Sequence, residues 1–215
     1  MTNFLYITYV IVIFCNAIIG ALQYGKMDKP LRVFYLLVAA IFINEVVIYL
    51  AGRNTNNIAI ISHIYSIFEL AIISIYFLYT ILAKPKWYLI VIAFLCSVIF
   101  ELVDISVQKI ENYNNYMIVV ESLLICPMAL YVLYNVSNRE DIYELSDYPH
   151  FYIWRSLLIW WSVTFFYWEF LIFIKKSNQY PVIFIYYLVF NILVYISIGY
   201  TLLRLKKTPN IINPT

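Results

Sequence analysis

The sequence predicts an all-α, polytopic membrane protein: a seven-transmembrane-helix bundle that forms one transmembrane domain over residues 1–215. Three observations support this prediction. Of the 215 residues, 64% are hydrophobic and 12% are charged, whereas a soluble domain carries about 25% charged residues. The mean hydropathy is +0.83. The apolar residues also form continuous runs, and a membrane-spanning helix needs about 20 of them. This composition excludes a soluble enzyme, a nucleic-acid-binding protein and a disordered chain.

Seven apolar runs are expected to form the helices. In chain order they cover residues 4–22, 33–51, 58–83, 87–107, 116–136, 151–174 and 180–203. The runs are continuous rather than alternating, which favours helices over the strands of a β-barrel. A helix also satisfies its backbone N–H and C=O groups internally, as lipid requires.

The connections between the runs are mostly short. No lysine or arginine precedes the first run, and the run is too long for the apolar part of a secretory signal, so we expect a permanent helix there. Residues 84–86 (Lys-Pro-Lys) form a tight hairpin between the third and fourth runs. Only the segment 137–150 is long enough to have structure of its own, and it is acidic.

The distribution of basic residues predicts the orientation. One side of the membrane carries ten of them: Lys26, Lys29, Arg32, Lys84, Lys86, Arg139, Arg155, Arg204, Lys206 and Lys207. The other side carries four: Arg53, Lys109, Lys175 and Lys176. Because basic residues favour the cytoplasmic side, the N-terminus is expected outside and the C-terminus in the cytoplasm. We therefore expect a multi-pass protein of the plasma membrane.

Six of the twelve acidic residues fall inside the expected helices. They are Glu45, Glu69, Glu101, Asp104, Glu121 and Glu169. Each would cost about 2.5–3.5 kcal/mol at the bilayer centre if it faced lipid. Most lie three to six residues from an outer helix end, where five or six residues correspond to a depth of about 8–9 Å. Acids from four helices thus share one outer level with His63 from a fifth, and Glu69 lies deeper.

Spacing along the helices places polar residues on common faces. Ser97, Glu101, Asp104 and Gln108 follow the i, i+4, i+7, i+11 pattern of one helix face. Such faces predict an acidic pocket that opens outward. Its candidate residues for binding a ligand or a proton are Asn44, Glu45, His63, Glu69, Glu101, Asp104, Glu121, Glu169 and Asn191.

Structural roles are open alternatives for most of these residues. Asp104 can pair with Lys109, and Glu45 can pair with Arg53. Glu169 has Lys175 and Lys176 nearby in the sequence. The two asparagines are as well suited to hydrogen bonds between helices as to ligand binding.

The acid-rich outer half favours a protein of receptor or sensor type that binds a cation or a small polar or amine ligand. A proton- or cation-coupled transporter that uses Glu69 is the alternative. A membrane-embedded hydrolase is less favoured, because Glu101 and Asp104 come with no nucleophile, and we do not expect an enzyme.

The expected partners are the lipid bilayer, the ligand and a cytoplasmic protein that docks on residues 137–150; nucleic acid is not expected. Carboxylate and amide oxygens suit a divalent cation. Residues 180–203 contain no lysine that could hold retinal as in microbial rhodopsins. The two histidines are too few for the three-histidine zinc site of seven-helix ceramidase-type hydrolases.

Overall fold

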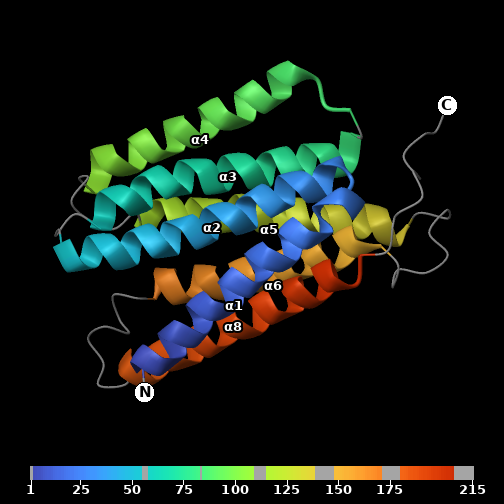
Figure 1. Cartoon of the computed structure of the whole chain (residues 1–215). Coiled ribbons are helices and arrows are strands. Elements are labelled where there is room, and N and C mark those ends of the chain that lie inside the picture. The colour runs from blue at the N-terminus through green and yellow to red at the C-terminus, as the bar shows by residue number, and fades with distance from the viewer. Residues whose placement is uncertain are drawn as a thin grey trace. The chain divides into compact units, whose positions relative to one another are not determined.

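The computed structural model describes residues 2–54, 58–82, 84–108, 115–138, 148–170 and 180–205. Within these ranges the chain forms seven α-helices, one short 3-10 helix and no strand (Figure 1). The elements are α1 (Thr2–Gln23), η1 (Tyr24–Lys26), α2 (Lys29–Asn54), α3 (Ile58–Leu82), α4 (Trp87–Gln108), α5 (Asn115–Ser137), α6 (Pro149–Glu169) and α8 (Tyr180–Leu203). The expected all-helical class is confirmed.

Six of the described helices are long and apolar enough to cross a membrane by length and composition, so the chain is a multi-pass membrane protein. The exception is α6, which contains His150, Arg155 and Glu169 and four of the five tryptophans of the chain. These residues lower its hydropathy. A seventh crossing at α6, and the orientation of the bundle, stay predictions.

The largest differences from the hydropathy runs are at the start of the second helix and at the end of the sixth. The second helix begins at Lys29 rather than at residue 33, because Asp28 caps it: the Leu31 N–H donates to Asp28 Oδ1 over 2.9 Å. The sixth helix begins at Pro149 and ends at Glu169 rather than at residue 174. Phe170 is the residue that follows the last helical one, and its N–H still donates to Phe166 O. Caps and turns set helix ends, and a count of apolar residues does not detect them.

Replacing Asp28 by alanine is expected to lower the free energy of unfolding by about 1 kcal/mol, because the Leu31 N–H loses its acceptor. Thermal unfolding of the purified protein in detergent micelles measures the change. Asp28→Asn is the control, since asparagine caps helices about as well as aspartate. Equal loss in both variants would contradict the capping role.

The described chain divides into two compact units. Unit 1 contains Met1–Gly20 and Ile118–Leu203, and unit 2 contains Ala21–Met117 and Arg204–Thr215. In unit 2, α3 packs against both α2 and α4, and Figure 1 shows it between them. In unit 1, α6 packs against α8. The single domain over 1–215 stays a prediction.

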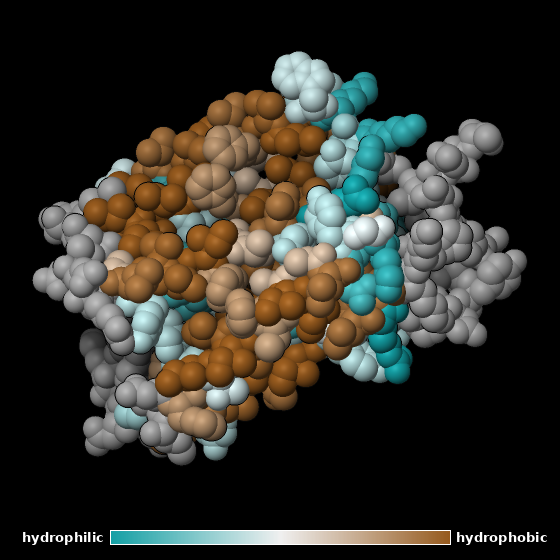
Figure 2. Space-filling model, viewed as in Figure 1, coloured by the Kyte–Doolittle hydropathy of each residue, from teal (hydrophilic) through white to brown (hydrophobic). Residues whose placement is uncertain are grey.

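Unit 2 presents apolar side chains along its helices and basic side chains at one end. On α4, Leu102 and Val107 are 60% and 65% exposed, as expected of a face that contacts lipid. Exposed lysines and an arginine gather where α2 begins and α3 ends, and Figure 2 shows hydrophilic residues at this end. They are Lys26, Lys29, Arg32, Lys84 and Lys86. We call this the basic end of unit 2.

Polar bonds join the helices of unit 1. Asn16 on α1 is buried, and its Nδ2 donates to the Tyr195 carbonyl of α8 over 2.7 Å. A Cβ atom at Gly199 would overlap Asn16 Oδ1 and lie 3.2 Å from its Cγ. Glycine at this position therefore allows α1 to approach α8 closely enough for the bond to form.

Candidate functional site

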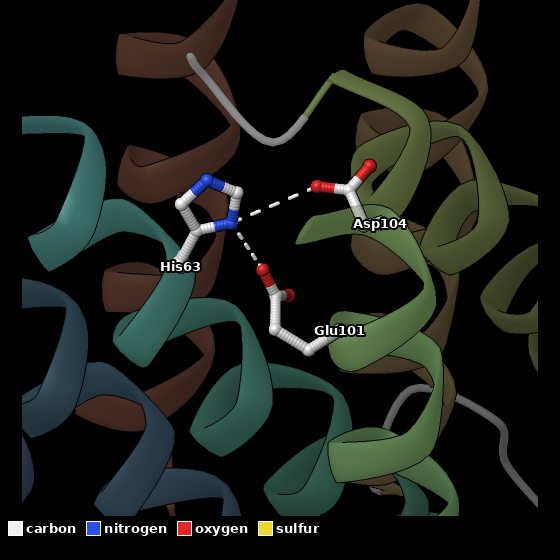
Figure 3. A group of neighbouring side chains, drawn as sticks. All are labelled: His63, Glu101 and Asp104. Carbon is white, nitrogen blue, oxygen red and sulfur yellow. Dashed lines mark hydrogen bonds and ion pairs between the residues drawn. The ribbon is translucent and has the colours of Figure 1, made fainter. Parts of the chain in front are cut away.

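Three ionisable side chains meet inside unit 2, between α3 and α4 (Figure 3). His63 comes from α3, and Glu101 and Asp104 come from α4. The two acids are three residues apart, so they lie one turn from each other on the same helix face. All three residues are buried, with exposures of 2%, 0% and 3%. We call this group the His–Glu–Asp centre.

Both carboxylates point toward the same ring nitrogen, as Figure 3 shows. His63 Nδ1 hydrogen-bonds to Glu101 Oε1 and lies 3.6 Å from Asp104 Oδ2. One candidate ligand atom from each residue lies within 4.8 Å of the others. The centre is therefore small enough for its three residues to share one proton or one ion.

A backbone group holds Asp104 in place. The Met117 N–H, in the first turn of α5, donates to Asp104 Oδ1 over 3.2 Å. The first N–H groups of a helix have no acceptor within the helix, so a carboxylate is a favourable partner there. The other oxygen, Oδ2, is left facing His63. The sequence does not reveal this contact, because a backbone donor has no side-chain signature.

Acidic groups are concentrated at the centre. Glu101 Oε2 is buried and accepts no hydrogen bond from the residues that the structure describes. None of the lysines and arginines whose side chains the structure describes is buried. Buried carboxylates are costly unless they are neutralised by a partner, an ion or a proton. The surroundings of the centre thus favour a cationic occupant.

Glu69, predicted to lie deeper, belongs to a second group on the other side of α3. It is 7% exposed, hydrogen-bonds to the Tyr65 side chain and interacts electrostatically with the half-buried Glu45 of α2. Six residues separate Glu69 from His63, which corresponds to roughly 240° around the helix and about 9 Å along it. Accordingly, His63 faces α4 while Glu69 faces α2.

The remaining candidates lie elsewhere. Asn44 is half-buried on α2. Glu121 belongs to unit 1 and is fully buried. Asn191 accepts a hydrogen bond from Trp160 Nε1 over 2.6 Å, so it joins α6 to α8. Glu169 is exposed and is the last residue of α6.

Some of the residues named in these predictions lie outside the residues that the structure describes. Residues 139–147, most of the acidic segment expected to dock a partner, are outside the described residues. The same holds for Lys109, Lys175 and Lys176, the expected partners of Asp104 and Glu169. The side chain of Arg53, the expected partner of Glu45, is also not described.

Fold and centre together define a helical multi-pass membrane protein with a buried histidine–carboxylate cluster. No protein-family model matches the chain, and neither curated proteins nor solved structures give a match. The donor atoms and burial of the centre are therefore the basis for the function proposed below.

Proposed function

We propose that this protein is a receptor- or sensor-type membrane protein that binds a small cation or amine at the His–Glu–Asp centre. One observation carries the proposal: a histidine and two carboxylates from α3 and α4 converge within a layer of largely apolar helices. Ionisable residues are expensive inside a membrane, and those that occur there usually have a functional role.

The arrangement of unit 2 supports binding more than conduction. The buried histidine and acids that the structure describes in this unit lie in the later half of α4 and the earlier half of α3, away from the basic end. A conduction path would have polar or ionisable side chains along its full length. In the proposed orientation this acid-rich end faces outward at the plasma membrane, and the segment 137–150 docks a cytoplasmic partner.

A specific observation favours a second candidate, a proton- or cation-coupled carrier. Glu69 lies further along α3 from its Ile58 end than His63 does, and it interacts electrostatically with a second acid, Glu45, on the neighbouring helix. Pairs of interacting carboxylates share protons, and transporters commonly place the coupling group near the middle of the bilayer.

Measurements of ligand binding and of ion flux distinguish the receptor from the carrier. We expect at least one cation among Mg²⁺, Ca²⁺, Mn²⁺, Zn²⁺ and methylammonium to raise the melting temperature of the detergent-solubilised protein saturably. Bound ligand stabilises by mass action, by about 2.7 kcal/mol at a concentration 100 times the Kd. Glu101→Gln should abolish the rise, whereas Ser97→Ala, one turn away on the same helix, should retain it.

The same protein in liposomes should dissipate no imposed pH gradient, followed with an entrapped pH-sensitive dye, whether or not the stabilising cation is present. If the protein dissipates the pH gradient and Glu69→Gln abolishes this activity, the result would refute the receptor proposal and support the carrier. Absence of stabilisation by every cation in the panel would refute the proposed binding site.

A further inference from the structure

We infer that the His–Glu–Asp centre is a binding site for a transition-metal dication of the Zn²⁺, Co²⁺ or Mn²⁺ class, ligated by His63 Nδ1 and one oxygen each of Glu101 and Asp104. The inference rests on the proposed function and deepens it, since it names the class of cation.

The donor atoms set this class. Mg²⁺ and Ca²⁺ prefer sites built entirely from oxygen ligands. An imidazole nitrogen suits Zn²⁺ and its first-row neighbours, and carboxylate oxygens are also regular ligands of these ions. One nitrogen and two carboxylates thus form a three-residue set that leaves further coordination positions for water or for a ligand.

The spacing of His63 and Asp104 is that of two ligands of one ion, and the Glu101 carboxylate has to move away from His63 to admit the ion. Ligands bound to Zn²⁺ at about 2.0–2.2 Å lie roughly 3–4 Å from one another. His63 Nδ1 and Asp104 Oδ2 are 3.6 Å apart, and one ligand atom from each of the three residues lies within 4.8 Å of the others. An ion between these atoms replaces the hydrogen bond between His63 and Glu101.

The ligands are also held in position by the fold. Two of them stand three residues apart on α4, and the third comes from the facing helix, as in metal sites within helix bundles. The Met117 N–H orients the Asp104 carboxylate through Oδ1 and leaves Oδ2 for the ion, the kind of outer contact that metal ligands regularly have.

One further observation and a charge argument point to a doubly charged occupant. Glu101 Oε2 is fully buried and accepts no hydrogen bond from the described residues. A dication neutralises both carboxylates at once, whereas a monovalent cation or an amine leaves one negative charge uncompensated inside the helical layer.

Metal binding to the full-length protein, purified in detergent and stripped with a chelator, tests the inference. We expect one tightly bound Zn²⁺ or Co²⁺ per chain by calorimetry, with weaker binding of Mg²⁺ and Ca²⁺. The Co²⁺ form should show visible absorption bands of a nitrogen- and oxygen-ligated ion. His63→Asn, which keeps an amide near the position of Nδ1, should weaken Zn²⁺ binding at least about tenfold. Substitutions of residues that only hydrogen-bond to a metal ligand already lower metal affinity by that much.

His150→Asn is the matched control, because it makes the same change at the other histidine, which is equally buried at 2% exposure. It should leave the affinity and the Co²⁺ spectrum unchanged. Glu101→Gln, nearly identical in shape to glutamate, provides a second test if His63→Asn does not fold, and circular dichroism and gel filtration verify the fold of each variant.

Three outcomes would overturn the inference: equal Zn²⁺ affinity in His63→Asn and His150→Asn, retained affinity in Glu101→Gln, or a preference for Mg²⁺ or Ca²⁺ over Zn²⁺ and Co²⁺. Stabilisation by methylammonium or Ca²⁺ that depends on Glu101, without transition-metal binding, would refute the metal class and leave the proposed function standing. No stabilisation by any cation would refute both.

Discussion

Replacing His63 by leucine is expected to lower the free energy of unfolding by about 3–5 kcal/mol in the chelator-treated protein, the usual cost of removing one partner from a buried ionic group. The imidazole hydrogen-bonds to Glu101 and lies beside Asp104. Without it, the two carboxylates face each other in an environment with little water. Unfolding with a denaturing detergent, followed by tryptophan fluorescence, measures the change.

The double variant His63→Leu/Glu101→Leu provides the control. It removes the histidine and the carboxylate bonded to it, so it should recover most of the loss, because buried ionic groups replaced together by apolar ones are often neutral or stabilising. A double variant less stable than His63→Leu would show that Glu101 contributes packing or polar contacts beyond its pairing with the histidine.

Gly199→Ala is expected to destabilise the protein by about 1–3 kcal/mol, the cost of leaving a buried polar group without its hydrogen bond. The added Cβ would overlap Asn16 Oδ1. Asn16 must then turn away and give up the bond from Nδ2 to the Tyr195 carbonyl. The measurement is the same unfolding titration.

Two variants test this explanation. Gly25→Ala makes the same change where a new Cβ would have no neighbour within 4 Å, so it should be nearly neutral. Asn16→Ala/Gly199→Ala removes the overlap, and a double-mutant cycle should then give a coupling free energy of about 0.5–3 kcal/mol, as for residues in contact. Strict additivity of the two changes would contradict the overlap.

The helices were largely predictable because lipid requires long apolar runs with internally bonded backbones. The seven expected runs coincide with the seven described helices. The ends were less predictable: α2 begins at Lys29, where Asp28 caps it, and α6 ends at Glu169. The cap depends on a single hydrogen bond, to which an average over a run of residues is insensitive.

The residues that form the His–Glu–Asp centre were only partly predictable from the sequence. The spacing of Glu101 and Asp104 places both on one face of α4, and all three residues of the centre were among the candidates from the sequence. Which helix each face meets depends on packing. The sequence therefore grouped Glu69 with His63, whereas α3 directs Glu69 toward α2 and His63 toward α4.

The Asp104 carboxylate has two oxygens with different neighbours. One faces the histidine, and the other accepts the N–H of Met117, the residue after which the chain leaves unit 2 and enters unit 1. A rotation of this one carboxylate, by an arriving ion or by any other cause, changes the anchoring of that peptide as well. The first turn of α5 and the His–Glu–Asp centre are thus joined through a single side chain.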